Sequence, residues 1–180
     1  MGSAAFGLND HGEAVGVSYV NMNGNIANAR PVRWNVVGRV DKLWEGDGII
    51  YCWWDEIQAK FICNQTAQYG GGIPLDINSN GWVAGRSQTN TYDGTPLPML
   101  GVPEGMAFVW DPTTGRRQDL GTLGGVNSTA EAINDAGQVA GTTQLANGEA
   151  RAFVWDAVSG MRDLGTLAGD YSYASAINAS

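Results

Sequence analysis

The sequence predicts an all-β fold, a β-propeller-like array of about four blades, each blade a four-stranded antiparallel sheet. Three observations lead to this prediction: a repeat of about 45 residues, a high glycine content, and short apolar segments separated by turn residues. Glycine accounts for 26 of the 180 residues and charged residues for only 16%. This balance favours many tight turns over long, charge-rich helices. We take residues 1–180 as a single repeat domain.

Three sequence blocks recur in the same order and define the repeat. The block Ala-Phe-Val-Trp-Asp at 107–111 returns at 152–156, and Asp-Leu-Gly-Thr-Leu at 119–123 returns at 163–167. The third block contains the pattern Ile-Asn-x-x-Gly-x-Val-x-Gly. Its copies lie at 76–85 and 132–141, with a weaker copy at 7–16 and a shorter one at 176–180. This regularity indicates one structural unit repeated along the chain.

The sequence pattern of each repeat predicts two hairpins. The Phe-Val-Trp segment at 108–110 is β-prone and lacks polar alternation, so we expect both of its faces to be buried between neighbouring sheets. Residues 111–115 contain the proline and glycine of a tight turn, and residues 134–137 predict a second turn. Residues 122–128, with two adjacent glycines, predict a loop.

The repeats divide the chain into unequal parts. They are a half-repeat at 4–19, a divergent repeat at 30–87 with an inserted hairpin at 49–66, and repeats at 106–143 and 151–180, the last truncated. The sequence starts and stops within the same block, so a strand expected at 174–180 duplicates the role of the strand at 4–9. Three interpretations remain open: a ring that closes on itself, a piece of a longer array, or blades completed between chains head to tail.

Composition and charge exclude several functions. A net charge of −8, a sequence pI near 4.4 and scattered basic residues argue against a nucleic-acid partner. No apolar run reaches the roughly 20 residues of a membrane span.

The single histidine, His11, falls in a predicted turn and is better explained as a turn residue than as a general base. Carboxylates such as Glu45 and Asp55 lack a distinctive arrangement. The sequence therefore predicts no catalytic residues and no enzyme.

The repeated blocks resemble the HAF-family extracellular repeat. The residues that carry the resemblance are Ala-Phe-Val-Trp-Asp, Asp-Leu-Gly-Thr-Leu-Gly-Gly and Ala-Ile-Asn-x-x-Gly-Gln-Val-x-Gly. Met106 and Arg151 stand where the family has its name-giving histidine, so no histidine-based role carries over. The match is specific over 106–180, fair over 72–87 and 4–19, and weak over 20–70. The resemblance implies a bacterial or archaeal secreted or cell-surface protein with a propeller-like fold. It does not imply any particular catalytic activity.

Two cysteines, Cys52 and Cys63, flank a predicted hairpin loop. If the hairpin is regular, they face each other across two strands and can form a disulfide. The extracellular location implied by the resemblance favours this disulfide over two buried free thiols.

Asp76, Asn78 and Asn80, followed by Gly81, have the alternating spacing of a calcium-binding loop. The glutamate that would complete such a loop is absent, because Ser87 occupies its position. A polar hairpin turn explains the same residues without a metal. Calcium is the only cofactor that the sequence suggests.

An aromatic cluster, Tyr51, Trp53 and Trp54, lies outside the repeated blocks. Such clusters bind sugars or protein partners, or pack in a core, and protein contact or core is the commoner role.

The resulting functional hypothesis is an extracellular or cell-surface scaffold protein. It self-assembles head to tail, as a filament or surface layer, through strands around Leu8 and Asn9 and around Ala176, Ile177 and Asn178. The alternative is a cell-surface binding module for a glycan or protein partner, with its binding loops around 49–66 and 88–105.

Overall fold

The computed structural model describes residues 2–19, 29–35, 40–42, 51–55, 60–64, 72–87 and 105–178, and the regular structure within these ranges is entirely β. The first sheet contains β1 (Gly2–Leu8), β2 (Ala14–Tyr19), β3 (Ala29–Trp34) and β4 (Val40–Lys42). The second sheet contains β7 (Gly72–Ile77), β8 (Val83–Ser87), β9 (Ala107–Asp111) and β10 (Arg116–Gly121). The third sheet contains β11 (Gly124–Ile133), β12 (Val139–Leu145), β13 (Ala150–Asp156) and β14 (Gly160–Asp163). A separate hairpin pairs β5 (Tyr51–Asp55) with β6 (Lys60–Asn64).

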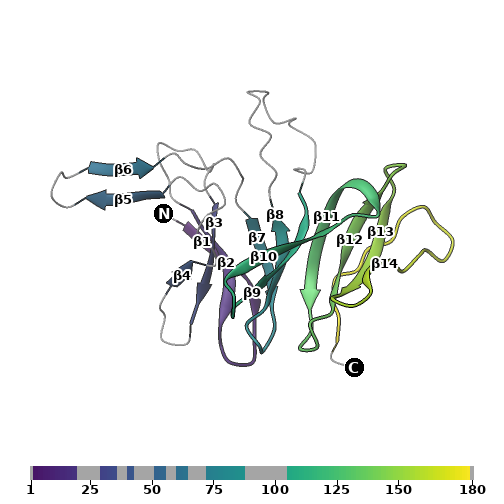
Figure 1. Ribbon diagram of the computed structural model, residues 1–180, viewed down its shortest axis with the longest axis horizontal. Coiled ribbons are helices and arrows are strands. Elements are labelled where there is room, and N and C mark those ends of the chain that lie inside the picture. Colours follow the sequence, from purple (N-terminus) through teal and green to yellow (C-terminus); the bar gives the residue numbers. More distant parts are fainter. Residues whose placement is uncertain are drawn as a thin grey trace.

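The three four-stranded sheets follow one another across the molecule in chain order (Figure 1). Neighbouring strands in every sheet are antiparallel. β7 lies against β1, β2 and β3, and β11 lies against β7, β8 and β9. The first strands of the second and third sheets thus each pack on the face of the sheet before them. The prediction of antiparallel four-stranded units is confirmed, and the described residues form an open array rather than a closed ring.

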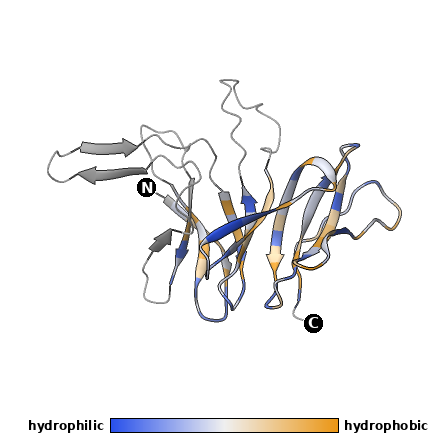
Figure 2. Cartoon of the chain, in the orientation of Figure 1, coloured by the Kyte–Doolittle hydropathy of each residue, from blue (hydrophilic) through white to orange (hydrophobic). Residues whose placement is uncertain are grey.

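β9 shows why short apolar segments form the inner part of each sheet. Ala107, Phe108, Val109 and Trp110 are all buried, as their lack of polar alternation predicts. In contrast, β10 forms the edge of the same sheet and is strongly hydrophilic (Figure 2). Charged residues on an edge strand hinder unwanted pairing with other chains.

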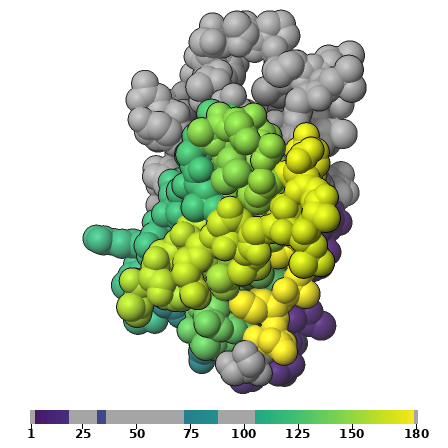
Figure 3. All heavy atoms as spheres, turned by 90° about the vertical axis from the view of Figure 1, so that its right-hand side faces the viewer, coloured from purple at the N-terminus to yellow at the C-terminus, as the bar shows by residue number. Residues whose placement is uncertain are grey.

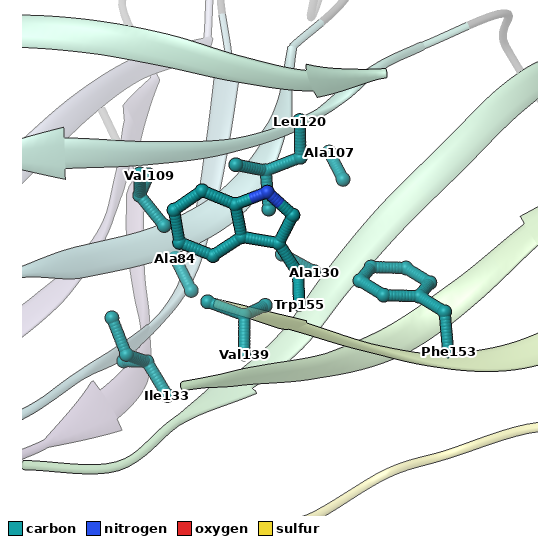
Figure 4. Close-up of a cluster of buried hydrophobic side chains, with 9 residues drawn as sticks. All are labelled: Ala84, Ala107, Val109, Leu120, Ala130, Ile133, Val139, Phe153 and Trp155. Atoms are coloured by element: carbon teal, nitrogen blue, oxygen red, sulfur yellow. The ribbon is translucent and has the colours of Figure 1, made fainter. Parts of the chain in front are cut away.

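The core lies between the sheets, where side chains from separate repeats interdigitate. One cluster joins the second and third sheets: Trp155 of β13 lies beside Val109 of β9 and Ala84 of β8, and Phe153 of β13 belongs to the same cluster (Figure 4). A second cluster, which includes Val15, Ile77 and Phe108, joins the first and second sheets. Buried apolar surface of this kind is the main stabilising contribution to a β-sheet stack.

The first strand of every four-stranded sheet bulges at the same point of the repeat. Its register against the second strand shifts between Ala5 and Gly7 in β1, Pro74 and Asp76 in β7, and Ala130 and Ala132 in β11. A bulge adds one residue to one strand and bends it, so the repeat bends each first strand at an equivalent place.

Two predictions of local structure are wrong. Residues 122–128 are mostly strand, because β11 starts at Gly124 and pairs with the extended end of β12. The strand expected at 174–180 is absent over 174–178, the part of it that the structure describes. The described residues place no further strand beside this segment with which it could form a ladder.

Candidate functional site: the junctions between sheets

A line of asparagines connects the sheets. The Nδ2 amide of Asn9 donates to the Asn78 carbonyl oxygen at 3.0 Å, and Nδ2 of Asn78 donates to the Asn134 carbonyl oxygen at 2.9 Å. Nδ2 of Asn134 donates in turn to the Asn178 carbonyl oxygen at 3.0 Å. The same residue of the repeat therefore forms the same bond at every step along the stack.

Each of these asparagines also closes its own hairpin turn. Oδ1 of Asn78 accepts the Trp82 N–H at 2.9 Å, and Oδ1 of Asn134 accepts the Gln138 N–H at 2.9 Å. An amide side chain can accept at one end and donate at the other, whereas an ionised carboxylate can only accept. Asparagine at this position can therefore serve local turn formation and contact between sheets at the same time.

A second polar contact crosses from the second to the third sheet. The Asp76 carboxylate accepts the Ile133 N–H at 2.9 Å. The Asp135 carboxylate accepts the N–H and hydroxyl of Ser79, and Nδ2 of Asn80 donates to the Asp135 carbonyl oxygen. These bonds fix the β7–β8 turn against the β11–β12 turn.

The three residues of the predicted calcium loop thus all have protein partners at this junction. Asp76 and Asn78 bind the next sheet, Asn78 also closes its own turn, and the Asn80 amide bonds to a backbone oxygen. Over the described ranges, no group of three or more His, Cys, Asp or Glu side chains is placed to hold a metal ion. The calcium site stays a prediction.

We expect the stability of this junction to depend on pH, because the Asp76 carboxyl is half-buried in it. Burial raises the pKa of the Asp76 carboxyl, opposed by the backbone N–H groups of Ile133 and Ile77. Burial also raises the pKa of Glu131, opposed by the positive charge of Arg86. A carboxyl whose pKa is higher in the folded state favours folding most when protonated. Stability should therefore fall as pH rises from the usual carboxyl pKa through these raised values.

We expect Asp76→Asn to weaken this decline of stability with pH. The introduced amide can still accept the Ile133 N–H through its oxygen, but it carries no charge to desolvate. Urea denaturation at a series of pH values measures the effect, and Glu131→Gln measures separately the contribution of the second half-buried carboxyl. Equal pH dependence in the wild type and Asp76→Asn would contradict a role for Asp76. Calcium titration of both proteins, followed by melting temperature, tests the metal prediction independently.

Serine hydroxyls form the third recurring contact. Oγ of Ser128 accepts the Ala107 N–H at 2.8 Å and donates to the Gly121 carbonyl oxygen at 2.6 Å. Oγ of Ser172, one repeat later, accepts the Ala152 N–H at 2.9 Å and donates to the Gly165 carbonyl oxygen at 2.7 Å. Ser172 therefore occupies a place on the third sheet equivalent to that of Ser128 on the second.

Residues 164–178, the terminal segment, lie along the third sheet at one end of the stack (Figure 3). Besides the Ser172 contacts, the segment is held by a bond from the Leu164 N–H to the Ala152 carbonyl oxygen and by the Asn134–Asn178 bond. The Arg151 guanidinium also donates to the Asp170 carbonyl oxygen. Large apolar side chains on the segment, including Leu167 and Tyr173, are exposed. The segment thus occupies a position on the third sheet equivalent to that of β11 on the second sheet. It does not pair as a strand with any of the described residues.

The opposite end of the stack exposes the outer face of β1. Leu8 follows the bulge of β1 as Ile77 follows that of β7 and Ile133 that of β11. Leu8 is 70% exposed, whereas Ile77 is 3% and Ile133 5% exposed, because each isoleucine packs on a preceding sheet. The face of β1 therefore has the form of a junction with no sheet opposite it among the described residues.

The predicted assembly residues consequently lie at the two ends of the stack, with Leu8 and Asn9 at one end and Ala176, Ile177 and Asn178 at the other. The sequence did not reveal the bonding role of the asparagines. Their recurrence before each Gly turn was the available signal, but it equally indicates a simple turn preference.

The remaining predicted sites belong to the β5–β6 hairpin. Its register places Cys52 directly opposite Cys63. The side chains of both cysteines, and of Tyr51, Trp53 and Trp54, lie outside the described part of the structure. The disulfide and the aromatic binding surface stay predictions.

No family model, curated protein or solved structure matches the chain. Over the described residues, no helix is long and apolar enough to cross a membrane.

Proposed function

We propose that the protein is a structural scaffold of propeller-like blades, about four when complete, that self-associates head to tail outside the cell or on its surface. The observation that supports this proposal most is the repeated asparagine bond, which joins each sheet to the next in one direction. A contact that always points from one unit to the next leaves different, complementary faces at the two ends. Such heterologous faces generate rings or open filaments.

Exposed apolar residues at both ends support the same function. Leu8 at one end and Tyr171 and Tyr173 at the other are exposed. Ile77 and Ile133, at the positions of the internal junctions equivalent to Leu8, are buried. Packing a further sheet on either end would remove apolar surface from water and favour association. The extracellular location rests on the resemblance of the repeats to the HAF family.

Sedimentation velocity of the full chain tests the proposal. We expect the mass to rise above 19.0 kDa as the concentration is raised from micromolar to millimolar, because association follows mass action. Electron microscopy should then show rings or filaments of stacked subunits. In Ile177→Asp, the introduced charge should loosen the terminal segment. A constant mass of 19.0 kDa for both the wild type and this variant would contradict the proposal.

A further inference from the structure

We propose that β1 of a second copy binds the third sheet at the place now held by residues 172–178, so that the terminal segment competes internally with head-to-tail assembly. This inference rests on the proposed function and names its contact surface. The partner is a second copy of this chain, because the outer face of β1 reproduces the residues with which the terminal segment already binds the third sheet.

The correspondence follows from the register of the repeat. We first align β1 with β11 through their bulges, and then align β11 with the terminal segment through Ser128 and Ser172. Four positions of β1 then match four positions of the segment. The residues are Ser3, Ala5, Leu8 and Asn9 in β1 and its turn, and Ser172, Ala174, Ile177 and Asn178 in the terminal segment. Three of the pairs are identical and the fourth pair is aliphatic in both.

The polar contacts of the site can be made equally well by β1. The Asn134 amide now donates to the Asn178 carbonyl oxygen and would donate instead to the Asn9 carbonyl oxygen of the second copy. The Asn78 carbonyl oxygen accepts two bonds, from Gly81 N–H and from Asn9, so a carbonyl at this position has room for both. The hydroxyl of Ser3, an exposed residue, would accept the Ala152 N–H as Ser172 does.

The terminal segment is the more easily displaced of the two occupants. It binds through scattered contacts on the sheet face, whereas β1 is a strand within a sheet, paired with β2 from Gly2 to Leu8. β1 would therefore bring a preformed sheet to the site, with less conformational entropy to lose on binding.

The reverse exchange, in which the terminal segment replaces β1 in the first sheet, is sterically disfavoured. Ala176 would then occupy the position of Gly7, where a Cβ atom would lie 2.7 Å from the Asp76 Cα and 3.0 Å from the Leu75 carbonyl oxygen. Both neighbours are backbone atoms, which cannot move away by a side-chain rotation. The exchange is therefore expected in one direction only: β1 of one copy replaces the terminal segment on the third sheet of another copy.

Two substitutions with opposite expected effects test the inference. Ile177→Asp places a charge on the half-buried side of the terminal segment, so we expect it to free the site and lower the dissociation constant of self-association at least tenfold. Leu8→Asp alters the exposed face of β1 and should abolish self-association, also when combined with Ile177→Asp. Val158→Asp is the matched control, because Val158 is 97% exposed in the β13–β14 turn and lies on neither face.

Sedimentation velocity of the four variants and the wild type separates the outcomes. Assembly that Ile177→Asp strengthens and Leu8→Asp abolishes, with Val158→Asp unchanged, would support the inference. Assembly that neither substitution alters would contradict this contact surface while leaving the scaffold function intact. A monomeric mass for wild type and Ile177→Asp alike would contradict both proposals. Ser172→Ala, which removes two hydrogen bonds of the terminal segment without adding charge, should act in the same direction as Ile177→Asp.

Discussion

Replacing Gly141 with alanine is expected to lower the free energy of unfolding by about 3 kcal/mol, the upper range for overpacking a well-packed core. A Cβ atom on Gly141 would lie 2.1 Å from the Thr129 carbonyl oxygen and 2.9 Å from two ring carbons of Phe153. The backbone oxygen belongs to the bulged strand opposite, and Phe153 is fully buried. Neither neighbour can move away without disturbing the third sheet.

The same glycine is required in all three sheets. A Cβ on Gly16 would lie 2.0 Å from the Ala4 carbonyl oxygen, and one on Gly85 would lie 2.2 Å from the Ile73 carbonyl oxygen. Each of these glycines pairs with the residue just before the bulge of the first strand. The glycine that ends the Val-x-Gly pattern is thus explained by the bulge, which brings the two backbones together.

Urea denaturation of Gly141→Ala measures the loss, with Gly169→Ala as the matched control. Gly169 has no atom within 4 Å of its added Cβ and should tolerate the methyl group with little change in stability. A similar urea midpoint for Gly141→Ala and the wild type would show that the backbone approach at the bulge is not a requirement of the fold.

The sequence predicts the repeating unit well, because its signals are local. The Asn-Asp-Ala-Gly turn of the third sheet forms as expected, with the Gly137 N–H bonded to the Asn134 carbonyl oxygen and a positive φ of 76° at Gly137. The burial of β9 likewise follows from its continuous apolar run. Turn residues and apolar runs act within a few positions, so a single sequence is enough to locate them.

The contacts between sheets could not be predicted in the same way. Asn78 and Asn134 are 56 positions apart, and nothing in either turn indicates which carbonyl oxygen the amide will meet. Asp76 illustrates the difficulty further, since its spacing to Asn78 and Asn80 resembles a calcium loop although its carboxylate accepts the Ile133 N–H. A polar side chain near a turn is compatible with a cap, a metal ligand or a contact with another sheet. Only the packing of the sheets distinguishes these roles.

Replacing Asn78 with alanine is expected to lower the free energy of unfolding by about 2 kcal/mol, as for buried polar groups that lose a partner. The Asn78 side chain accepts the Trp82 N–H and donates to the Asn134 carbonyl oxygen, both at 2.9 Å, and the residue is only 4% exposed. Alanine would remove both bonds and leave the two backbone groups to be satisfied by water. Asn80→Ala is the matched control, because it removes a single exposed bond to the Asp135 carbonyl oxygen and should change stability by about 0.5 kcal/mol or less.

Asn78→Asp separates the turn contact from the contact between sheets. The introduced carboxylate can still accept the Trp82 N–H, but its second oxygen would face the Asn134 carbonyl oxygen without a proton to donate. Burial and this repulsion should raise its pKa in the folded state, so the variant should become more stable as pH falls and its carboxyl gains the missing proton. Urea denaturation over the acid range, compared with Asn78→Ala, measures the recovery. If Asn78→Asp kept the stability of the wild type at every pH while Asn78→Ala lost it, the asparagine would contribute only to its own turn, and the line of bonds that orders the sheets would carry no stabilising energy.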